Sequence, residues 1–489
     1  MQENEERKSH ESEEPGLLHA RSVSRREFLK LAGIGGATVA MGAGLGGLVA
    51  ACGGSTTTTT AATTPTTAGP TTTATGPTTT SGPATTAGPV AGRDIKIGLV
   101  NALTGSLAPF AASDNWMIDK WKAFAANGIV LGDNQSHKFQ FVVGDSQSDS
   151  NRAAQVTGDL INNSKVDMVM VSSSPDTVSP TADQCEALGT PMIANFVPWQ
   201  PFYFRSANPP ANGYKWTYAH AIGLEQLQDE FTAIWASLST NKTIGALFPN
   251  DADGNAWRSG WDPVWAAKGL KMIDGGSFQD GSEDYSSQIA KFKNAGCEIV
   301  MGVLIPPDFV NFWKQAVQQG FKPKIATIGK ALLFQSAVEA AGTIAYNVTV
   351  EGAWHRSYPS KSSLTGETAD QLAADFESTT GKQWIQPIGQ YAKFEWCVDI
   401  FKRTTNVDDK EEVIKNVAAT EMDTVLGHID FTSPVAQGTD HPVPNVYRAP
   451  LSGCQWVKGT KYFTDLAIVD NTDYPAATVT AKTLPMQYS

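Results

Sequence analysis

Candidate binding groups gather in loops that follow short apolar runs of the chain. Three consecutive serines offer hydroxyl groups ahead of a predicted helix, where free backbone N–H groups favour an anion. Aspartates and a lysine offer opposite charges in other loops, and aromatic residues offer apolar walls. The candidate ligand-binding residues are Phe110, Ser172, Ser173, Ser174, Thr177, Trp199, Tyr203, Asp253, Asp308 and Lys330. This set suits the binding of a small polar molecule with a flat or apolar part.

Each of these residues also has a purely structural interpretation. The serines can cap a helix, and Trp199 can belong to the core. Asp308 follows two prolines at a predicted helix start, where the helix dipole favours an acid. Lys330 can be a solvated surface charge. The position of the serines directly after a strand is what favours a ligand role for them.

The chain shows no spacing typical of a catalytic or metal site. The histidines are scattered, and the GxSxG, HExxH and GxxxxGK[ST] motifs are absent. Residues 251–262 begin like a calcium loop, but the glycine required at its sixth position is Ala256. We therefore predict no cofactor, no metal and no enzymatic step. Besides Cys52, the cysteines are Cys185, Cys297, Cys397 and Cys454, and none belongs to a CxxC pair that would support a metal site. Export would allow them to be oxidised, but we expect buried free thiols, because Cys185 and Cys297 fall within apolar segments.

Two series of alternating strands and helices follow from the hydrophobic pattern. The first has strands at 95–100, 139–143, 166–171 and 191–194 and helices at 114–126, 153–162 and 179–188. The second has strands at 243–248, 270–275, 298–303 and 324–328 and helices at 257–268, 285–295 and 309–319. Continuously apolar strands are typical of parallel sheets covered on both faces, so we predict an α/β protein with two doubly wound lobes.

The loops that carry the candidate residues lie at one end of these strands. Ligands of open α/β sheets bind outside the carboxyl ends of the strands. Those loops are 103–110, 172–177 and 195–204 in the first lobe and 249–254, 305–309 and 329–330 in the second. If the lobes face each other, all six loops line one cleft. The last third of the chain, with a strand at 347–353, helices at 369–379 and 389–402, and a hairpin of 446–457 and 462–469, is expected to be shared between the lobes.

The first 52 residues carry two processing signals. Arg25 and Arg26 precede a weakly hydrophobic segment, as in twin-arginine export signals. A run of small residues ends at Cys52 and resembles a bacterial lipobox, whose cysteine is acylated and becomes the new N-terminus. The alternative is a transmembrane helix at 31–51, but its many glycines make it a poor spanning helix. We predict an exported protein that is lipid-anchored on the outer side of the cell membrane.

A tether and a folded body follow the signal. Residues 53–93 are mostly Thr, Pro, Gly and Ala, a composition that predicts a disordered linker. Residues 94–489 are too many for one compact core and sufficient for two lobes. The formal net charge of -12 argues against a nucleic-acid or anionic-membrane partner for this body. The expected membrane contact is the lipid anchor alone.

Several segments of the body together resemble one known family. They are IKIGLV (95–100) with LTG (103–105), SSS (172–174), LGTPMI (188–193), DYSSQI (284–289), GFKP (320–323) and TVLGHIDF (424–431). In this order they resemble the type I periplasmic substrate-binding proteins of ABC importers, in the branched-chain amino-acid group. The resemblance implies two lobes that are joined by a three-strand hinge and close around a ligand. It places lobe 1 at about 94–220 plus 331–431 and lobe 2 at about 221–330 plus 432–489.

The resemblance transfers unevenly to the binding residues. The family's carboxylate-binding serines match 172–174, and its aromatic residue after the first strand matches Phe110. The family's tyrosine before a glycine is here Asp253, its head-group loop is 196–199, and its ammonium-binding acid is replaced within 327–330. Because an unpaired buried ammonium is costly, either Asp253 or Asp308 takes that role, or the ligand is not an α-amino acid. We predict that leucine, isoleucine and valine are not the best ligands.

The resemblance implies a membrane-tethered receptor with a monomeric body. Such a receptor would deliver a small polar ligand, an amino acid or a related compound, to the permease and ATPase subunits of an ABC importer. Two alternatives stay open. A sensor of the same fold would signal instead, and an exported hydrolase would turn the ligand over, although the sequence has no nucleophile–base pair.

Overall fold

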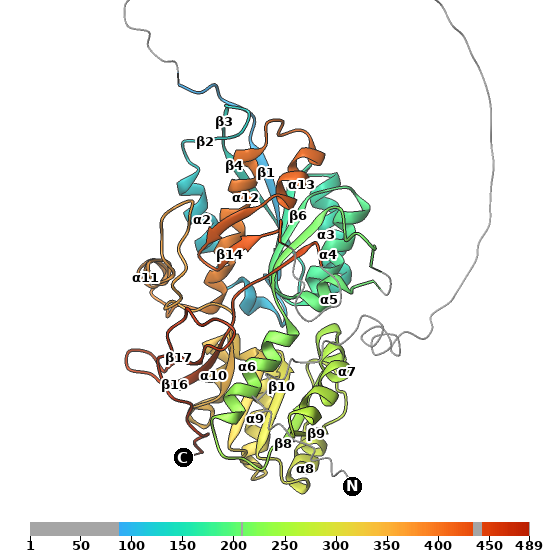
Figure 1. Ribbon diagram of the computed structural model, residues 1–489, viewed down its shortest axis with the longest axis vertical. Helices are drawn as coiled ribbons and strands as arrows, with labels where there is room; N and C mark the ends of the chain where they lie inside the picture. The colour runs from blue at the N-terminus through green and yellow to red at the C-terminus, as the bar shows by residue number, and fades with distance from the viewer. Residues whose placement is uncertain (1–87, 207–208, 434–442, 489) are drawn as a thin grey trace, which may run out of the picture. The chain divides into compact units, whose positions relative to one another are not determined.

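The computed structural model describes residues 88–206, 209–433 and 443–488, which are built around two β-sheets (Figure 1). The predicted export signal at Arg25 and Arg26, the predicted lipidation site at Cys52 and the predicted tether up to residue 87 lie outside the described residues. No helix in the described ranges has the length and apolar character needed to cross a membrane.

The first sheet has six strands in the order β15-β7-β6-β5-β1-β4, and all neighbouring strands are parallel. They are β1 (Ile95–Asn101), β4 (Phe139–Asp145), β5 (Met168–Ser172), β6 (Met192–Pro198), β7 (Thr217–Ile222) and β15 (Val446–Arg448). One face packs against α3 (Ser150–Asn162) and α4 (Pro175–Ala187), the other against α2 (Asp114–Phe124) and α12 (Ala392–Arg403). Burial on both faces is the reason why these strands are continuously apolar.

The second sheet has seven strands in the order β17-β16-β12-β11-β10-β8-β9. They are β8 (Thr243–Leu247), β9 (Lys271–Asp274), β10 (Ile299–Leu304), β11 (Ile325–Lys330), β12 (Thr349–Gly352), β16 (Ser452–Lys458) and β17 (Thr464–Asp470). Only β16 breaks the parallel pattern, because it runs antiparallel to both β12 and β17. We call the part of the molecule built on the first sheet the first half and the part built on this sheet the second half. The helices of the second half are α6 (Leu224–Ala236), α7 (Ala252–Ala267), α8 (Ser286–Asn294), α9 (Pro306–Gln318) and α10 (Gln335–Ala341).

The remaining described elements are short or lie over the first sheet. They are η1 (Ala108–Ala111), β2 (Ile129–Val130), β3 (Ser136–His137), α5 (Trp199–Tyr203), η2 (Ala331–Leu333), η3 (Thr343–Ala345), α11 (Ala369–Thr380), η4 (Gln386–Tyr391), α13 (Lys410–Ala418), β13 (Glu421–Thr424) and β14 (Gly427–Asp430). The predicted α/β class with two doubly wound sheets is confirmed. The sequence pattern missed β7 and α6, and it predicted a loop where α5 forms.

The chain passes between the two sheets three times, but two of the passages differ from the prediction. The expected change of lobe near Ala331 is wrong, because β12 follows that point and still pairs with β11. The expected change just after Phe431 is also wrong, because β15 lies beyond it and joins β7 of the first sheet. The predicted single strand at 446–457 is therefore two strands, one in each sheet. Local hydrophobicity does not encode which edge a strand joins.

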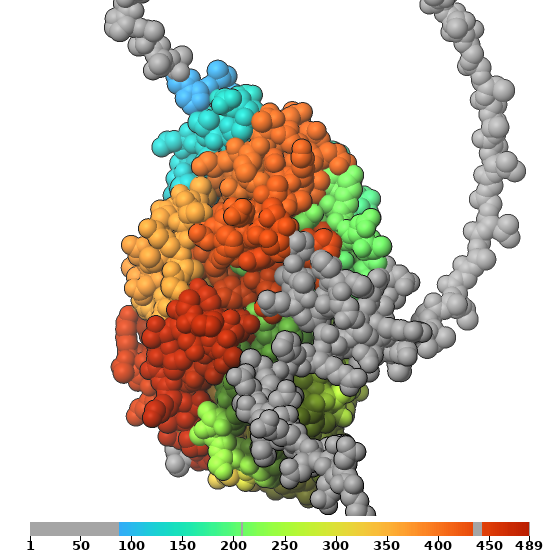
Figure 2. All heavy atoms as spheres, in the orientation of Figure 1, coloured from blue at the N-terminus to red at the C-terminus, as the bar shows by residue number. Residues whose placement is uncertain are grey.

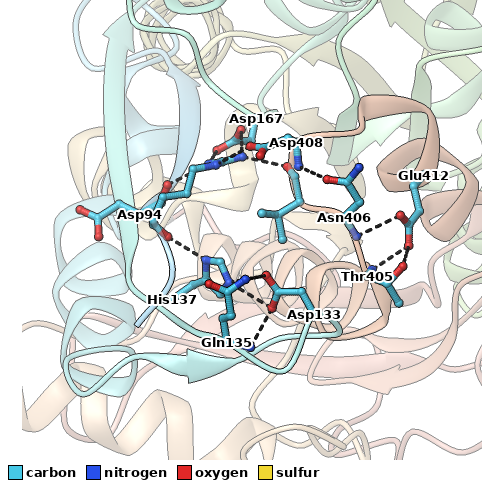
Figure 3. A network of polar contacts seen from close by, with 11 residues as sticks. Asp94, Asp133, Gln135, His137, Asp167, Thr405, Asn406, Asp408 and Glu412 are labelled. Carbon is cyan, nitrogen blue, oxygen red and sulfur yellow. Dashed lines mark hydrogen bonds and ion pairs between the residues drawn. The ribbon is translucent and has the colours of Figure 1, made fainter. Parts of the chain in front are cut away.

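The body begins slightly before residue 94, because Arg93 binds Asp167 and Asp408, two of the acids labelled in Figure 3. Its guanidinium donates two parallel hydrogen bonds of 2.9 Å to the Asp167 carboxylate and one of 2.6 Å to Asp408. Upstream, the Gly92 N–H donates to the Ser136 carbonyl at 2.9 Å. These contacts fix the chain at the amino end of β1. This end of the sheet lies opposite the carboxyl ends of the strands.

The C-terminal residues cover part of the second half of the molecule. The segment that includes β16 and β17 forms a contiguous surface on the face shown in Figure 2.

The expected state of the cysteines is confirmed, since the four in the described residues are buried free thiols, namely Cys185, Cys297, Cys397 and Cys454.

Candidate functional site

A small cavity lies where the carboxyl ends of the strands of both sheets meet. Its volume is about 40 Å³, room for about three water molecules. The first half of the molecule contributes Phe110, Ser173, Ser174, Pro175, Phe196, Pro198 and Ile222. The second half contributes Leu227, Asp253, Trp257, Val303, Gly329, Lys330, Leu333 and Glu351. Five of the predicted site residues, Phe110, Ser173, Ser174, Asp253 and Lys330, thus line one cavity.

Aromatic side chains form the apolar walls of this cavity. Phe110 packs edge-on against Phe334, with ring centroids 5.0 Å apart. Trp257 stacks on Trp261 at 3.5 Å and on Phe231 at 5.7 Å. These contacts hold the rings in place, so apolar surfaces surround the polar groups of the cavity.

Lys330 is the charged centre of the cavity. Its ammonium Nζ lies 3.0 Å from Asp251 Oδ2 and 3.4 Å from Asp253 Oδ2, both at the start of α7. A third carboxylate, that of Asp176 on α4, lies 3.9 Å away and belongs to the first half of the molecule. Burial lowers the pKa of Lys330, but Asp251 and Asp253 outweigh it, and the pKa rises above its ordinary value. The lysine is therefore a permanent cation that bridges the two halves.

Two cavity carboxylates keep an oxygen without a partner in the described residues. Asp253 Oδ1 and Glu351 Oε2 are buried and accept no hydrogen bond, and the Ser173 hydroxyl opposite them is also unpartnered. Burial raises the pKa of Asp253 to about 6, against the attraction of Lys330. Burial likewise raises the pKa of Glu351 to about 7, against the hydrogen bond that its Oε1 accepts from the Lys330 N–H at 3.0 Å. Unsatisfied buried polar atoms are rare and costly, so they mark a place for a ligand.

The backbone is strained at two residues of the cavity wall. Lys330 has φ 64° and ψ -64°, and Phe196 has φ 57°. Side-chain-bearing residues seldom adopt positive φ, and such strain gathers at functional sites. At Lys330 this turn ends β11 and brings the backbone N–H to Glu351.

The other predicted hydroxyl residues do not reach the cavity. Ser172 donates a short hydrogen bond to Asn195 Oδ1 and accepts one from Lys393 at 3.0 Å. Thr177 lies one turn into α4 and donates to the Ser174 carbonyl at 3.4 Å. Both hydroxyls are buried and occupied by the fold of the first half. Adjacent residues after a strand point in different directions, so three consecutive serines cannot all face one ligand.

Trp199 and Tyr203 are core residues of the first half. They lie on α5 and belong to the hydrophobic cluster under α4. The Trp199 indole N–H donates to Glu225 Oε1 at 3.1 Å, and the Tyr203 ring packs on Phe204 and Tyr214. The prediction that they form walls of the cavity is wrong, because the segment expected to be a loop forms a helix with a buried side.

Asp308 supports a neighbouring loop instead of lining the cavity. Its two carboxylate oxygens accept from the Gly281 N–H at 3.0 and 3.1 Å. Burial raises its pKa to about 6, opposed by that same hydrogen bond. The carboxylate at the start of α9 thus has a structural role.

Glu351 is the cavity residue that the sequence did not reveal. It belongs to β12, which the resemblance assigns to the other lobe, and it reaches Lys330 because β12 pairs with β11. A glutamate within a buried strand was the available signal, since charged residues are almost never fully buried without a purpose.

A larger cavity, of about 490 Å³, lies where the connections between the sheets run close together. Its walls include Gln226, His428, Tyr447 and Arg448. Two of these side chains have acidic partners, with His428 on Asp423 at 2.8 Å and Arg448 on Glu225 at 3.4 Å. The small cavity is the stronger candidate, because it combines the strand ends with unpartnered buried polar atoms.

Comparison with known proteins identifies the family. A family model described as periplasmic binding protein matches residues 94–449. The chain belongs to the periplasmic binding protein family. Among curated relatives of this periplasmic binding protein, Leu/Ile/Val-binding protein homolog 7 of Brucella suis biovar 1 (strain 1330) is 26% identical over 133 residues, 27% of this chain and 33% of that protein. The matching part therefore spans about a third of the length of that relative.

Solved structures share the fold of this periplasmic binding protein. A leucine-binding protein from Thermotoga maritima MSB8 has a TM-score of 0.62 and 16% identity over 78% of this chain and 99% of that chain. An ABC transporter solute-binding protein from Rhodopseudomonas palustris BisB5, in complex with 3,4-dihydroxybenzoic acid, has a TM-score of 0.62 and 14% identity over 80% of this chain and 98% of that chain. The expected type I fold and family are confirmed.

Proposed function

We propose that this chain is an extracytoplasmic solute-binding lipoprotein that captures a small organic carboxylate between two lobes and delivers it to an ABC importer. The observation that carries this proposal is the buried cavity at the facing strand ends. One wall offers the unpartnered hydroxyl of Ser173, and the opposite wall offers unpartnered oxygens of Asp253 and Glu351. A binding protein needs such prepared polar groups, and it needs no nucleophile.

The two walls favour opposite ends of a ligand. Ser173 lies at the N-terminus of α4, where a hydroxyl and the helix dipole favour a carboxylate. On the other wall, Asp253 and Glu351 outnumber Lys330, the one cation among the residues that line the cavity, and Asp251 adds a third carboxylate 3.0 Å from the Lys330 Nζ. That excess favours a hydrogen-bond donor such as an ammonium or hydroxyl group. Asp253 and Glu351 would thus replace the ammonium-binding acid that the family pattern lacks here. The compounds named for two relatives, leucine and 3,4-dihydroxybenzoic acid, both carry a carboxyl group and a donor group.

Capture would require motion of the two halves. A cavity of about 40 Å³ is far smaller than an amino acid, so a ligand enters only if the walls separate. We propose lobes that follow the two sheets and a hinge formed by the three passages between them. The contact of Lys330 with Asp176 spans the lobes at 3.9 Å and would break on opening.

Thermal shift of the purified body tests the function. Leucine, isoleucine, benzoate and 3,4-dihydroxybenzoate are compared with their amides and with sugars, because a ligand that binds only the folded state raises the melting temperature. We expect carboxylates to stabilise the wild type, and Ser173→Ala and Asp253→Asn each to weaken binding by about tenfold, the effect of one lost polar contact. The control is Thr177→Ser, outside the cavity. Stabilisation by none of the carboxylates contradicts the proposed ligand class.

The membrane attachment is part of the same proposal. Arg25 and Arg26 would direct export, Cys52 would carry the lipid, and residues up to 87 would separate the body from the membrane. Replacement of both arginines by lysine is expected to block export of a reporter fused after Cys52. Continued export of that reporter would show that the general secretory route suffices.

A further inference from the structure

A buried lysine lies directly behind the serine loop of the cavity. Lys393 on α12 is 2% exposed, and its Nζ donates to Ser172 Oγ at 3.0 Å and to Gln390 Oε1 at 3.4 Å. Within the described part of the chain, no carboxylate forms an ion pair with it. A buried ammonium without a paired counter-ion is costly and needs a reason.

The hydrogen-bond network that includes this lysine reaches three of the four segments that the first half contributes to the cavity. Ser172 precedes Ser173, and it donates to Asn195, which precedes the cavity residue Phe196. Asn195 Nδ2 donates to the Gln390 carbonyl at 3.5 Å, and Gln390 Nε2 donates to the Phe110 carbonyl at 2.9 Å. The network is therefore built around one wall of the cavity.

The charge of Lys393 is only partly balanced. Burial lowers its pKa to about 8, and the one charged group that acts on it is Asp114 at the start of α2, which opposes this. Burial raises the pKa of Asp114 to about 6, and its Oδ1 has no partner in the described residues. The groups that contact Lys393 from β5 and η4 are neutral. At neutral pH both groups are mostly ionised, and the ammonium of Lys393 is the charge that hydrogen-bonds Ser172 directly behind this wall.

We propose that Lys393 selects ligands with an anionic group by holding a positive charge behind Ser172, one residue from the unpartnered hydroxyl of Ser173. This inference rests on the proposed function and names the residue that sets its ligand charge. Lys393 does not line the cavity, so it is a positioning residue that acts through Ser172 and through its field. Asp253 and Glu351, the acids proposed to bind an ammonium or hydroxyl group of the ligand, lie in the opposite wall.

Paired ligands that differ only in charge test the role of this lysine. Leucine is compared with leucinamide and benzoate with benzamide, by calorimetric titration of the wild type and Lys393→Met. We expect the variant to lose about tenfold or more of its preference for the carboxylate over the amide, the effect of one removed charge in a buried site. Lys410→Met is the matched control, because Lys410 on α13 also donates to a hydroxyl, that of Thr190 at 2.9 Å, and does not line the cavity.

Proton uptake gives a second readout that needs no variant. Binding of benzoate near pH 8 should raise the pKa of Lys393, so the wild type should take up as much as about half a proton per ligand. Titration in two buffers of different ionisation enthalpy measures this uptake, and benzamide should cause none. Besides Asp114, the charged groups around the site are Asp176 at the start of α4, on the same side as the serine loop, and Lys330, Asp253 and Glu351 on the opposite wall. Proton uptake that persists in Lys393→Met comes from these other groups, so the difference between the wild type and the variant is the uptake by Lys393.

The outcomes distinguish this inference from the proposed function. If no carboxylate binds the wild type, the proposed function itself is overturned, and the role of Lys393 with it. If carboxylates bind but Lys393→Met keeps the same preference, the inference is overturned and the function stands. Equal loss of carboxylate and amide binding would show a merely structural role. Absence of proton uptake by the wild type would overturn the inference even if the variant does not fold.

Discussion

Replacement of Glu351 by glutamine should stabilise the protein in a manner that depends on pH. Glu351 is 4% exposed, and its Oε1 accepts the Lys330 N–H while its Oε2 has no partner in the described residues. An amide oxygen can accept the same hydrogen bond without carrying a charge. Glu351→Gln therefore removes the buried charge and keeps the contact that orients the turn at Lys330.

The size of the effect follows from the two pKa values of this carboxyl group. Burial raises the pKa from its ordinary value of 4.5 to about 7 in the folded protein. A pKa difference of one corresponds to about 1.4 kcal/mol. Ionisation of Glu351 therefore lowers the free energy of unfolding by about 3 kcal/mol. The folded state holds the proton more tightly, so stability falls as the pH rises from 4.5 to 7 and is constant on either side. Most of the change, about 2 to 3 kcal/mol, develops between pH 5 and pH 8.

Urea unfolding of the wild type and Glu351→Gln at pH 5 and pH 8 measures this difference. We expect similar stabilities at pH 5 and a variant more stable by about 2 to 3 kcal/mol at pH 8. Glu421→Gln on β13 is the control, because it makes the same change of charge at an exposed position. A Glu351→Gln gain that is equal at both pH values would refute the reasoning, because the stabilisation would then not come from removal of a buried charge.

Three further predictions concern the cavity, its surroundings and the anchor. Lys330→Met should lower the free energy of unfolding by about 3 to 5 kcal/mol at pH 8, because it leaves buried carboxylates uncompensated. Urea titration should show partial recovery as the pH falls and Asp253 takes up a proton, which in this variant occurs above the wild-type pKa of about 6 because the lowering effect of Lys330 is lost. Asp308→Ala should cost about 1 to 3 kcal/mol through the lost Gly281 contact, and a changed ligand affinity would contradict its structural role. Cys52→Ser should move the protein from the membrane to the soluble fraction in cell fractionation, and unchanged membrane association would argue against lipidation.

Much of the site was predictable because strand ends are encoded locally. Ser173, Asp253 and Lys330 each follow a short apolar run, and parallel strands bring their carboxyl ends to one edge. The β7 strand was missed because its buried residues include Thr217 and His220, which interrupt the apolar pattern. Trp199 was misplaced because the neighbouring prolines suggested a loop, whereas the tertiary structure gives that segment a helix with a buried side.

The sequence by itself determined the α/β class, the alternation of the two series and the loops that meet at the cavity, because these depend on local periodicity. The roles of Glu351 and Lys393 depend on tertiary contacts that local periodicity does not encode. Glu351 enters the cavity through the pairing of β12 with β11, and Lys393 reaches Ser172 across 221 residues of chain. Such long-range contacts depend on which strands become neighbours and on which face each helix covers. Neither choice is encoded in the periodic pattern of hydrophobic residues.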